Sequence, residues 1–179
     1  MNDMANKAIR LGVIGAVAAL MLASVNHFTE PVIRERKKAE LEAALMELSG
    51  GLPVGAMEAE PAEGVAKRWP IGSGQGWLLE LNAVGYGGAM TVVASYAEDG
   101  EVISARLMDN SETVGFGKKA EDPEYMTIFA GKGGAVPLPR NKTELGDDLD
   151  TVSGATVTFN GINKAVTRGS ALVQEWESR

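Results

Sequence analysis

The sequence predicts an α+β protein, in which one N-terminal transmembrane helix precedes a domain with an antiparallel sheet and flanking helices. Three observations predict this class. An uncharged apolar run covers residues 11–25, strand-like segments follow one another between residues 77 and 108, and an amphipathic helical pattern ends the chain. A chain of 179 residues is long enough for one domain and a modest additional segment.

The composition excludes several classes of chemistry. The chain has 17 Lys and Arg against 24 Asp and Glu, so its net charge of −7 argues against a nucleic-acid partner, which needs a basic surface. No cysteine is present, which excludes disulfides, cysteine-ligated iron–sulfur clusters and thiol nucleophiles. A single histidine excludes a His-rich metal site. We therefore expect no metal site and no catalytic residue. Any demanding chemistry has to come from an organic cofactor or from carboxylates, unless the chain performs none.

The N-terminal apolar run predicts a membrane anchor in residues 1–30. The stretch from residue 8 to residue 28 contains 21 positions. A helix of that length is about 31 Å long, close to the thickness of a hydrocarbon core of about 30 Å. A cleaved signal peptide is the alternative, because Lys7 and Arg10 give the segment a basic start. The absence of a clear small-x-small cleavage site favours a retained single-pass anchor.

A juxtamembrane helix is expected over residues 31–51, with the remaining domain at 52–179. Pro31 suits the first turn of this helix, where a missing N–H is tolerated. Ser49-Gly50-Gly51 is expected to end it, and residues 52–66 are predicted to form a loop. The apolar stripe of this helix consists of Leu41, Ala44, Leu45 and Leu48.

The middle of the chain predicts three strands, at residues 77–84, 89–96 and 102–108. Glu98-Asp99-Gly100 joins the last two as a hairpin, because Asp-Gly favours the positive φ angles of such turns. Residues 110–119 lack periodicity and are expected to form a functional or structural loop. A short helix is predicted over residues 122–129, opened by Asp122-Pro123.

The last segment predicts an amphipathic helix whose first turn favours a phosphate. Ser153 is expected to cap this helix, with the start at this residue or several residues later. The hydroxyls of Ser153 and Thr156 then lie near free N–H groups and the positive end of the helix dipole. The apolar stripe consists of Ile162, Ala165, Val166, Gly169, Leu172, Val173 and Trp176.

Four motifs in a fixed order carry a family resemblance. They are Gly85-Tyr86-Gly87-Gly88, Glu112-Thr113-Val114-Gly115-Phe116-Gly117, Phe129-Ala130-Gly131-Lys132 and Ser153-Gly154-Ala155-Thr156. With the anchor before them, they resemble the G subunit of the Rnf-type membrane complex, the ion-translocating ferredoxin:NAD oxidoreductase. At a greater distance, the chain is similar to the C subunit of the sodium-translocating NADH:quinone oxidoreductase. The resemblance covers residues 8–175.

The resemblance implies an FMN-binding domain in which the FMN phosphate forms a phosphodiester with Thr156. A flavin transferase makes this bond in the family and recognises an Asp-x-x-Ser/Thr-Gly-Ala-Thr pattern. The matching residues here are Asp150, Ser153, Gly154, Ala155 and Thr156. Alternatively, the Ser-Gly-Ala-Thr segment is only a cap between two elements.

The family's Glu-Thr-Pro-Gly-Leu-Gly loop is matched with two departures. Val114 stands where the family has proline, which leaves the loop less rigid, and Phe116 stands where the family has leucine. Lys119 is a candidate for the flavin phosphate or a flavin carbonyl. The other residues that the resemblance assigns to the cofactor are Glu112, Thr113, Gly115, Gly117, Gly85, Tyr86 and Gly87.

The resemblance also implies the function. The chain is expected to carry electrons within a larger complex that transfers them between ferredoxin and NAD, rather than to act as an enzyme alone. Its expected partners are the other subunits, the flavin transferase and the lipid bilayer. The family places the flavin domain on the periplasmic face of the inner membrane, whereas the basic residues between positions 34 and 38 favour the cytoplasmic side. The alternatives are the corresponding quinone-reductase subunit and a membrane-tethered module without a cofactor.

Overall fold

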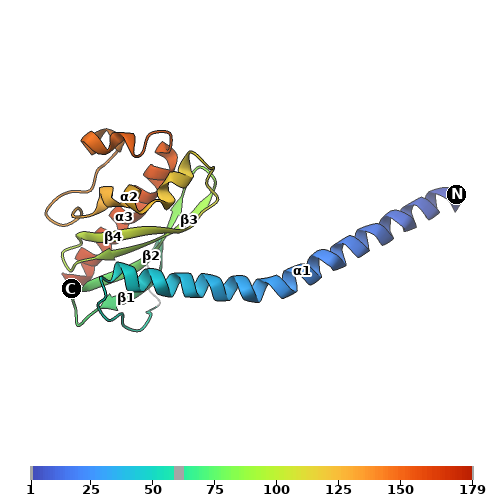
Figure 1. The fold of residues 1–179 in the computed structure, drawn as a ribbon, viewed down its shortest axis with the longest axis horizontal. Helices are drawn as coiled ribbons and strands as arrows, with labels where there is room; N and C mark the ends of the chain where they lie inside the picture. Colours follow the sequence, from blue (N-terminus) through green and yellow to red (C-terminus); the bar gives the residue numbers. More distant parts are fainter. Residues whose placement is uncertain (1, 59–62, 179) are drawn as a thin grey trace. The chain divides into compact units, whose positions relative to one another are not determined.

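The computed structural model describes residues 2–58 and 63–178 (Figure 1). The chain divides into two compact units, the first ending at Glu42 and the second beginning at Ala43. The second unit holds the sheet, and its architecture confirms the α+β class.

The helix α1 covers Asn2–Leu48 without interruption and contains Pro31. Its apolar part is long enough to cross a bilayer, with a mean hydropathy of 2.1. The expectation that Pro31 begins a second helix is wrong. The proline removes one backbone hydrogen bond, but the helix-forming residues on both sides of it keep the remaining bonds, so the helix continues. Two residues before it, the hydroxyl of Thr29 donates to the carbonyl of Val25 at 2.7 Å.

The last turn of α1 belongs to the second unit, and the predicted end of the helix is confirmed. Ala44, Leu45 and Leu48 are buried, as their apolar spacing predicts. Gly50 and Gly51 follow with φ angles of 63° and 80°, which side-chain-bearing residues rarely adopt, and the helix stops before them.

Four antiparallel strands form one sheet in the order β1-β2-β3-β4. The three predicted strands are confirmed as β2 (Gly76–Val84), β3 (Ala89–Tyr96) and β4 (Val102–Asp109). Gly100 has a φ of 82° in the predicted hairpin turn.

The strand β1 (Val65–Ile71) escaped the sequence prediction, which placed residues 65 and 66 in a loop and no strand before residue 77. Lys67, Arg68 and Pro70 obscure its alternation. Proline is tolerated in this strand because β1 lies at the edge of the sheet, where one row of N–H groups needs no strand partner.

The helix α3 (Thr156–Glu177) packs against β2 and β3 and covers one face of the sheet (Figure 1). Its predicted stripe faces the core, with Ile162, Ala165, Val166 and Val173 buried. The expectation that Ser153 caps the helix is wrong: Ala155 occupies the cap position and makes no side-chain cap bond. Residues 151–154 form turns instead, so the helix begins three residues after Ser153.

Short helices complete the domain. The predicted helix after Asp122 is present as α2 (Pro123–Met126) and η2 (Thr127–Phe129), and the Asp122 carboxylate caps it by accepting from the backbone N–H of Glu124. Two further short helices flank them in the sequence: η1 (Gly117–Glu121) precedes α2, and η3 (Lys142–Asp150) follows η2. Both border the N-terminal end of α3 and thereby position the site described next.

Candidate functional site

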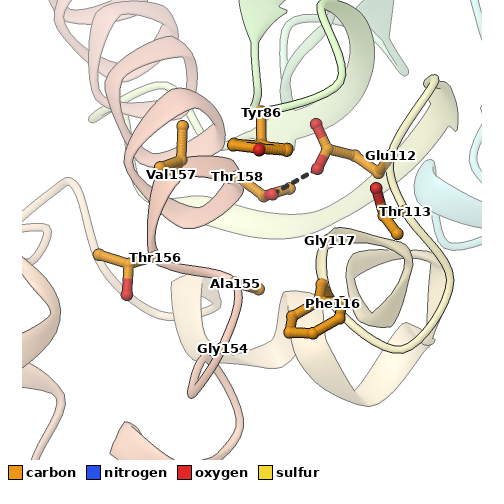
Figure 2. Close-up of a pocket in the computed structure, with 10 residues that line it drawn as sticks. All are labelled: Tyr86, Glu112, Thr113, Phe116, Gly117, Gly154, Ala155, Thr156, Val157 and Thr158. Atoms are coloured by element: carbon orange, nitrogen blue, oxygen red, sulfur yellow. Dashed lines mark hydrogen bonds between the residues drawn. The ribbon is translucent and has the colours of Figure 1, made fainter.

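A pocket of about 470 Å³ lies at the N-terminal end of α3 (Figure 2). This volume lies within the range of small-molecule sites. Three segments far apart in the chain form its walls: the β2–β3 turn, the loop before η1, and the entry into α3. The lining residues are Tyr86, Glu112, Thr113, Phe116, Gly117, Gly154, Ala155, Thr156, Val157 and Thr158.

The carboxylate of Glu112 holds these three segments together. Glu112 is only 5% exposed. The backbone N–H of Gly87 donates to Oε1 at 2.9 Å. The hydroxyl of Thr158 donates to Oε2 at 2.7 Å, the bond drawn as a dashed line in Figure 2. A buried carboxylate is stable when several donors surround it, and here the donors come from the β2–β3 turn and from α3.

Three of the predicted glycines are required by contacts within the protein. A Cβ atom on Gly117 or on Gly85 would overlap with the Glu112 carboxylate, and a Cβ on Gly87 would overlap with the carbonyl of Ser111. Gly85 and Gly117 therefore let the backbone approach the central carboxylate, and Gly87 lets the β2–β3 turn approach the backbone at Ser111. Glycine is required at position 115 for a different reason: its φ of 82° lies in the left-handed region, which other residues rarely adopt.

Apolar side chains with large exposed areas form the rest of the wall. Tyr86 is 77% exposed, Phe116 is 58% exposed and Val157 is 52% exposed, although all three line the pocket. Figure 2 shows that the two rings come from different segments, Tyr86 from the β2–β3 turn and Phe116 from the loop before η1. A flat aromatic ligand would cover these surfaces and gain the free energy of apolar burial.

Thr156 is the first residue of α3 and is half-buried at the edge of the pocket. The ammonium of Lys142 donates to its Oγ1 at 3.1 Å. A second ammonium, that of Lys119, donates to the carbonyl of Ser153 at 3.3 Å. Positive charge from two lysines and from the N-terminal end of α3 therefore surrounds the turn that carries the Thr156 hydroxyl.

Two ionisable groups near the pocket have shifted pKa values. Burial raises the pKa of Tyr125 above its ordinary range, and the negative charge of Glu112 raises it further. The pKa of Glu121 is lowered, first by a hydrogen bond from the Asn110 amide and then by one from the Lys118 ammonium. The two hydrogen bonds to Glu121 order the segment that connects β4 to η1.

Seven residues that the sequence assigned to a cofactor line the pocket. They are Tyr86, Glu112, Thr113, Gly117, Gly154, Ala155 and Thr156. Six others lie nearby without lining it: Gly85, Gly87, Gly115, Lys119, Asp150 and Ser153. Of these, Asp150 and Ser153 are joined by a backbone hydrogen bond of 3.2 Å that shapes the turn before Thr156.

Sequence reasoning did not assign Phe116, Val157, Thr158 or Lys142 to the site. The first three lie inside or directly beside the motifs, so extending each motif to its neighbours would have included them. Lys142 lies 14 positions before Thr156, and no local pattern connects the two.

Comparison with known proteins identifies the family of this chain. Residues 85–170 match the FMN-binding domain, and residues 1–48 match the RnfG N-terminal region. The G subunit of the ion-translocating oxidoreductase complex of Cereibacter sphaeroides is 30% identical to the chain, over 90% of this chain and 80% of that protein. The chain belongs to the RnfG family. The G subunit of the same kind of complex in Pseudomonas aeruginosa is 25% identical, over 92% of this chain and 86% of that protein.

A third RnfG relative has a more specific name. The G subunit of the proton-translocating ferredoxin:NAD(+) oxidoreductase complex of Clostridium ljungdahlii is 24% identical, over 86% of this chain and 80% of that protein. In the RnfG-family chain described here, the FMN-binding match begins at the β2–β3 turn and includes every residue that lines the pocket.

The pocket fits FMN by the chemistry of its walls. Tyr86, Phe116 and Val157 offer exposed apolar area for a planar ring. At the edge, Thr156 provides a hydroxyl and Lys142 a cation, which suit a phosphate. The apolar area and the cationic edge thus correspond to the two chemical parts of FMN.

Proposed function

We propose that this chain is the flavin-bearing electron-carrier subunit of a membrane-bound, ion-translocating oxidoreductase complex that transfers electrons between ferredoxin and NAD. Membership of the RnfG family and the name of the Clostridium ljungdahlii relative support the proposal. The observation that carries it is the position of Thr156, whose hydroxyl lies at the edge of a pocket within the FMN-binding match. Bound FMN supplies the redox chemistry, while the chain attaches and orients it.

The proposed attachment is a phosphodiester between FMN and the Oγ1 of Thr156. In this step Oγ1 attacks the phosphorus of an activated FMN, a phosphoanhydride brought by a flavin transferase. The new Oγ1–P bond replaces the anhydride P–O bond, the leaving group departs with its own phosphate, and the hydroxyl proton passes to a base of the transferase. The chain gains the mass of FMN less one water.

Covalent attachment suits a domain on the periplasmic face of the inner membrane, where a lost FMN is not readily replaced. We propose that residues 1–30 provide the membrane anchor, residues 31–51 the juxtamembrane segment and residues 52–179 the flavin domain. The apolar part of α1 supports the anchor. Attachment also keeps the cofactor at high effective concentration beside its electron donor and acceptor.

Intact-mass measurement of the full chain, produced in membranes with and without a flavin transferase, tests the attachment. With the transferase, the mass should rise by FMN less one water and the denatured band should fluoresce. Thr156→Ala should lose both signals, whereas Thr167→Ala, an exposed threonine on the same helix, should keep both. A wild-type chain that stays dark at its unmodified mass would instead support a tethered module without a cofactor.

Protease treatment of intact spheroplasts tests the proposed orientation. A periplasmic domain should be cut in intact spheroplasts, leaving a membrane-bound fragment of α1. Protection until the membrane is lysed would contradict the proposal and would agree with the basic residues between positions 34 and 38. A cytoplasmic marker protein that stays uncut shows that the spheroplasts are sealed.

A further inference from the structure

We infer that Lys142 is the residue that positions the phosphate group at Thr156, an inference that rests on the proposed function. Its Nζ donates to Thr156 Oγ1 at 3.1 Å. The Lys142 side chain is half-buried, so water competes less for this contact than at an open surface. Within residues 2–58 and 63–178, no carboxylate lies within ion-pairing distance of Nζ, so the charge is available to an anion.

The segment that carries Lys142 is ordered by hydrogen bonds on both sides of it. Asn141 precedes η3 and accepts from the backbone N–H of Thr143 at 2.9 Å. The buried amide of Asn163, on α3, donates to the carbonyl of Pro139 at 2.6 Å. The entry into η3 is thereby tied to the helix that begins with Thr156.

The backbone around Lys142 is fixed before any ligand arrives, because these bonds lie within the protein. Binding an anion at this place therefore costs less conformational entropy than binding it with a lysine on a mobile loop. This distinguishes Lys142 from Lys119, which is exposed and donates to a backbone carbonyl rather than to the hydroxyl itself.

Before attachment, the lysine orients the hydroxyl. Because the ammonium donates to Oγ1, the hydroxyl proton must point away from Lys142, toward an incoming base. The positive charge also stabilises negative charge that develops on Oγ1 as its proton leaves.

After attachment, Oγ1 becomes the bridging oxygen of the ester. The ammonium then lies beside a phosphodiester, whose two non-bridging oxygens share one negative charge. A charge-assisted hydrogen bond to one of them would hold the phosphate against the start of α3. The same lysine thus serves the attachment and the resting position of the cofactor.

The rate of flavin attachment tests this inference in the full chain, produced in membranes with its flavin transferase. Lys142→Met removes the charge and keeps an unbranched chain, so we expect the initial rate of FMN incorporation, measured by intact mass, to fall about tenfold or more. Lys142→Arg should recover part of the rate. Lys164→Met is the matched control, because Lys164 is an exposed lysine on α3 outside the pocket lining, and should match the wild type.

Amine labelling of the wild-type chain gives a second readout that needs no substitution. Acetic anhydride should modify Lys142 more slowly after flavin attachment than before it, because the ammonium then donates to the phosphate. Lys164 should react equally in both forms. If Lys142→Met loses its thermal unfolding transition and therefore does not fold, this measurement alone tests whether Lys142 contacts the attached phosphate.

The outcomes separate the two proposals. A wild-type chain that never gains FMN contradicts the proposed function. A wild-type chain that gains FMN, while Lys142→Met gains it equally fast or Lys142 stays equally reactive to acetic anhydride, overturns the inference about Lys142 alone.

Discussion

Thr158 and Glu112 are joined by a hydrogen bond of 2.7 Å that connects the first turn of α3 to the loop before η1. The other oxygen of the same carboxylate accepts from the backbone N–H of Gly87 at 2.9 Å. One buried charge therefore holds together all three segments that form the pocket. The shape of the site depends on Glu112 even if this carboxylate never contacts a ligand.

Thr158→Val tests the strength of this connection. The substitution keeps the volume of the side chain and leaves the buried carboxylate with one donor fewer, so we expect a loss of about 2 kcal/mol in the free energy of unfolding. Denaturant unfolding of the full chain in detergent micelles measures it. In a double-mutant cycle with Glu112→Ala, the two losses should not add, because Glu112→Ala also removes the acceptor of the Thr158 hydroxyl. Strict additivity would contradict the assigned contact.

Gly117→Ala and Gly115→Ala separate two roles of glycine in one loop. A Cβ on Gly117 overlaps with the buried carboxylate, whereas a Cβ on Gly115 meets open space and costs only the left-handed φ of 82°. We expect Gly115→Ala to lower the free energy of unfolding by about 1 kcal/mol and Gly117→Ala to lower it by about 3 kcal/mol. The same unfolding experiment measures both, and equal losses would show that the overlap is relieved by loop movement.

The aromatic walls should protect a bound flavin without stabilising the fold. Because Tyr86 and Phe116 are largely exposed, we expect Tyr86→Ala and Phe116→Ala to change the free energy of unfolding by less than about 0.5 kcal/mol. Iodide should quench the fluorescence of the attached flavin more strongly in both variants than in the wild type. Val114→Ala is the control, because Val114 is an apolar side chain outside the pocket lining that is at least as exposed as Tyr86 and Phe116. Unchanged quenching in both aromatic variants would mean that the ring lies elsewhere.

The elements that were predicted correctly have strong local patterns. β3 (Ala89–Tyr96) has the bounds that its apolar run and the following Asp99-Gly100 turn predict. β1 was missed because its charged residues and Pro70 are tolerated only at a sheet edge, and whether a strand lies at an edge is a tertiary property. The same limit applies to Pro31. Whether a proline begins a helix or lies inside one depends on whether the segment before it is already helical, which Pro31 itself does not show.

The lining of the pocket could be predicted from the sequence for residues inside the family motifs, but not for residues outside them. Tyr86, Glu112 and Thr156 line one pocket although they come from three distant segments. The motifs did not show that Glu112 is a buried structural carboxylate, because its partners are donors brought by the fold. Lys142 was not identifiable for the same reason: its contact with Thr156 exists only after η3 and α3 have packed together.

The shifted pKa of Glu121 predicts a pH dependence in the segment before η1. Its carboxyl has a lowered pKa in the folded chain, so its bonds to Asn110 and Lys118 stabilise the fold above the ordinary value of 4.5. That contribution is lost as the pH falls below 4.5 and through the lower folded pKa. Asn110→Ala should move the pKa of Glu121 back toward its ordinary value, as read from the ¹³C carboxyl shift. Because Glu121 is solvent-accessible, its effect on the free energy of unfolding should be small, and a pKa that Asn110→Ala leaves unchanged would contradict the assigned cause.

Replacing either of two buried tyrosines with phenylalanine should change the free energy of unfolding, in opposite directions for the two positions. Tyr125 and Tyr96 both have pKa values raised by burial, so both stay neutral well above pH 10. The hydroxyl of Tyr96 donates to the carbonyl of Val166 at 3.0 Å, whereas that of Tyr125 has no hydrogen-bond partner among the described residues and lies in the field of Glu112. Tyr96→Phe should therefore lower the free energy of unfolding by about 1 kcal/mol, while Tyr125→Phe, which removes an unsatisfied buried group, should raise it by a similar amount. Denaturant midpoints of the two variants in the full chain measure this difference, and a loss of stability in Tyr125→Phe would show that its hydroxyl has a partner, such as an ordered water, that balances its burial.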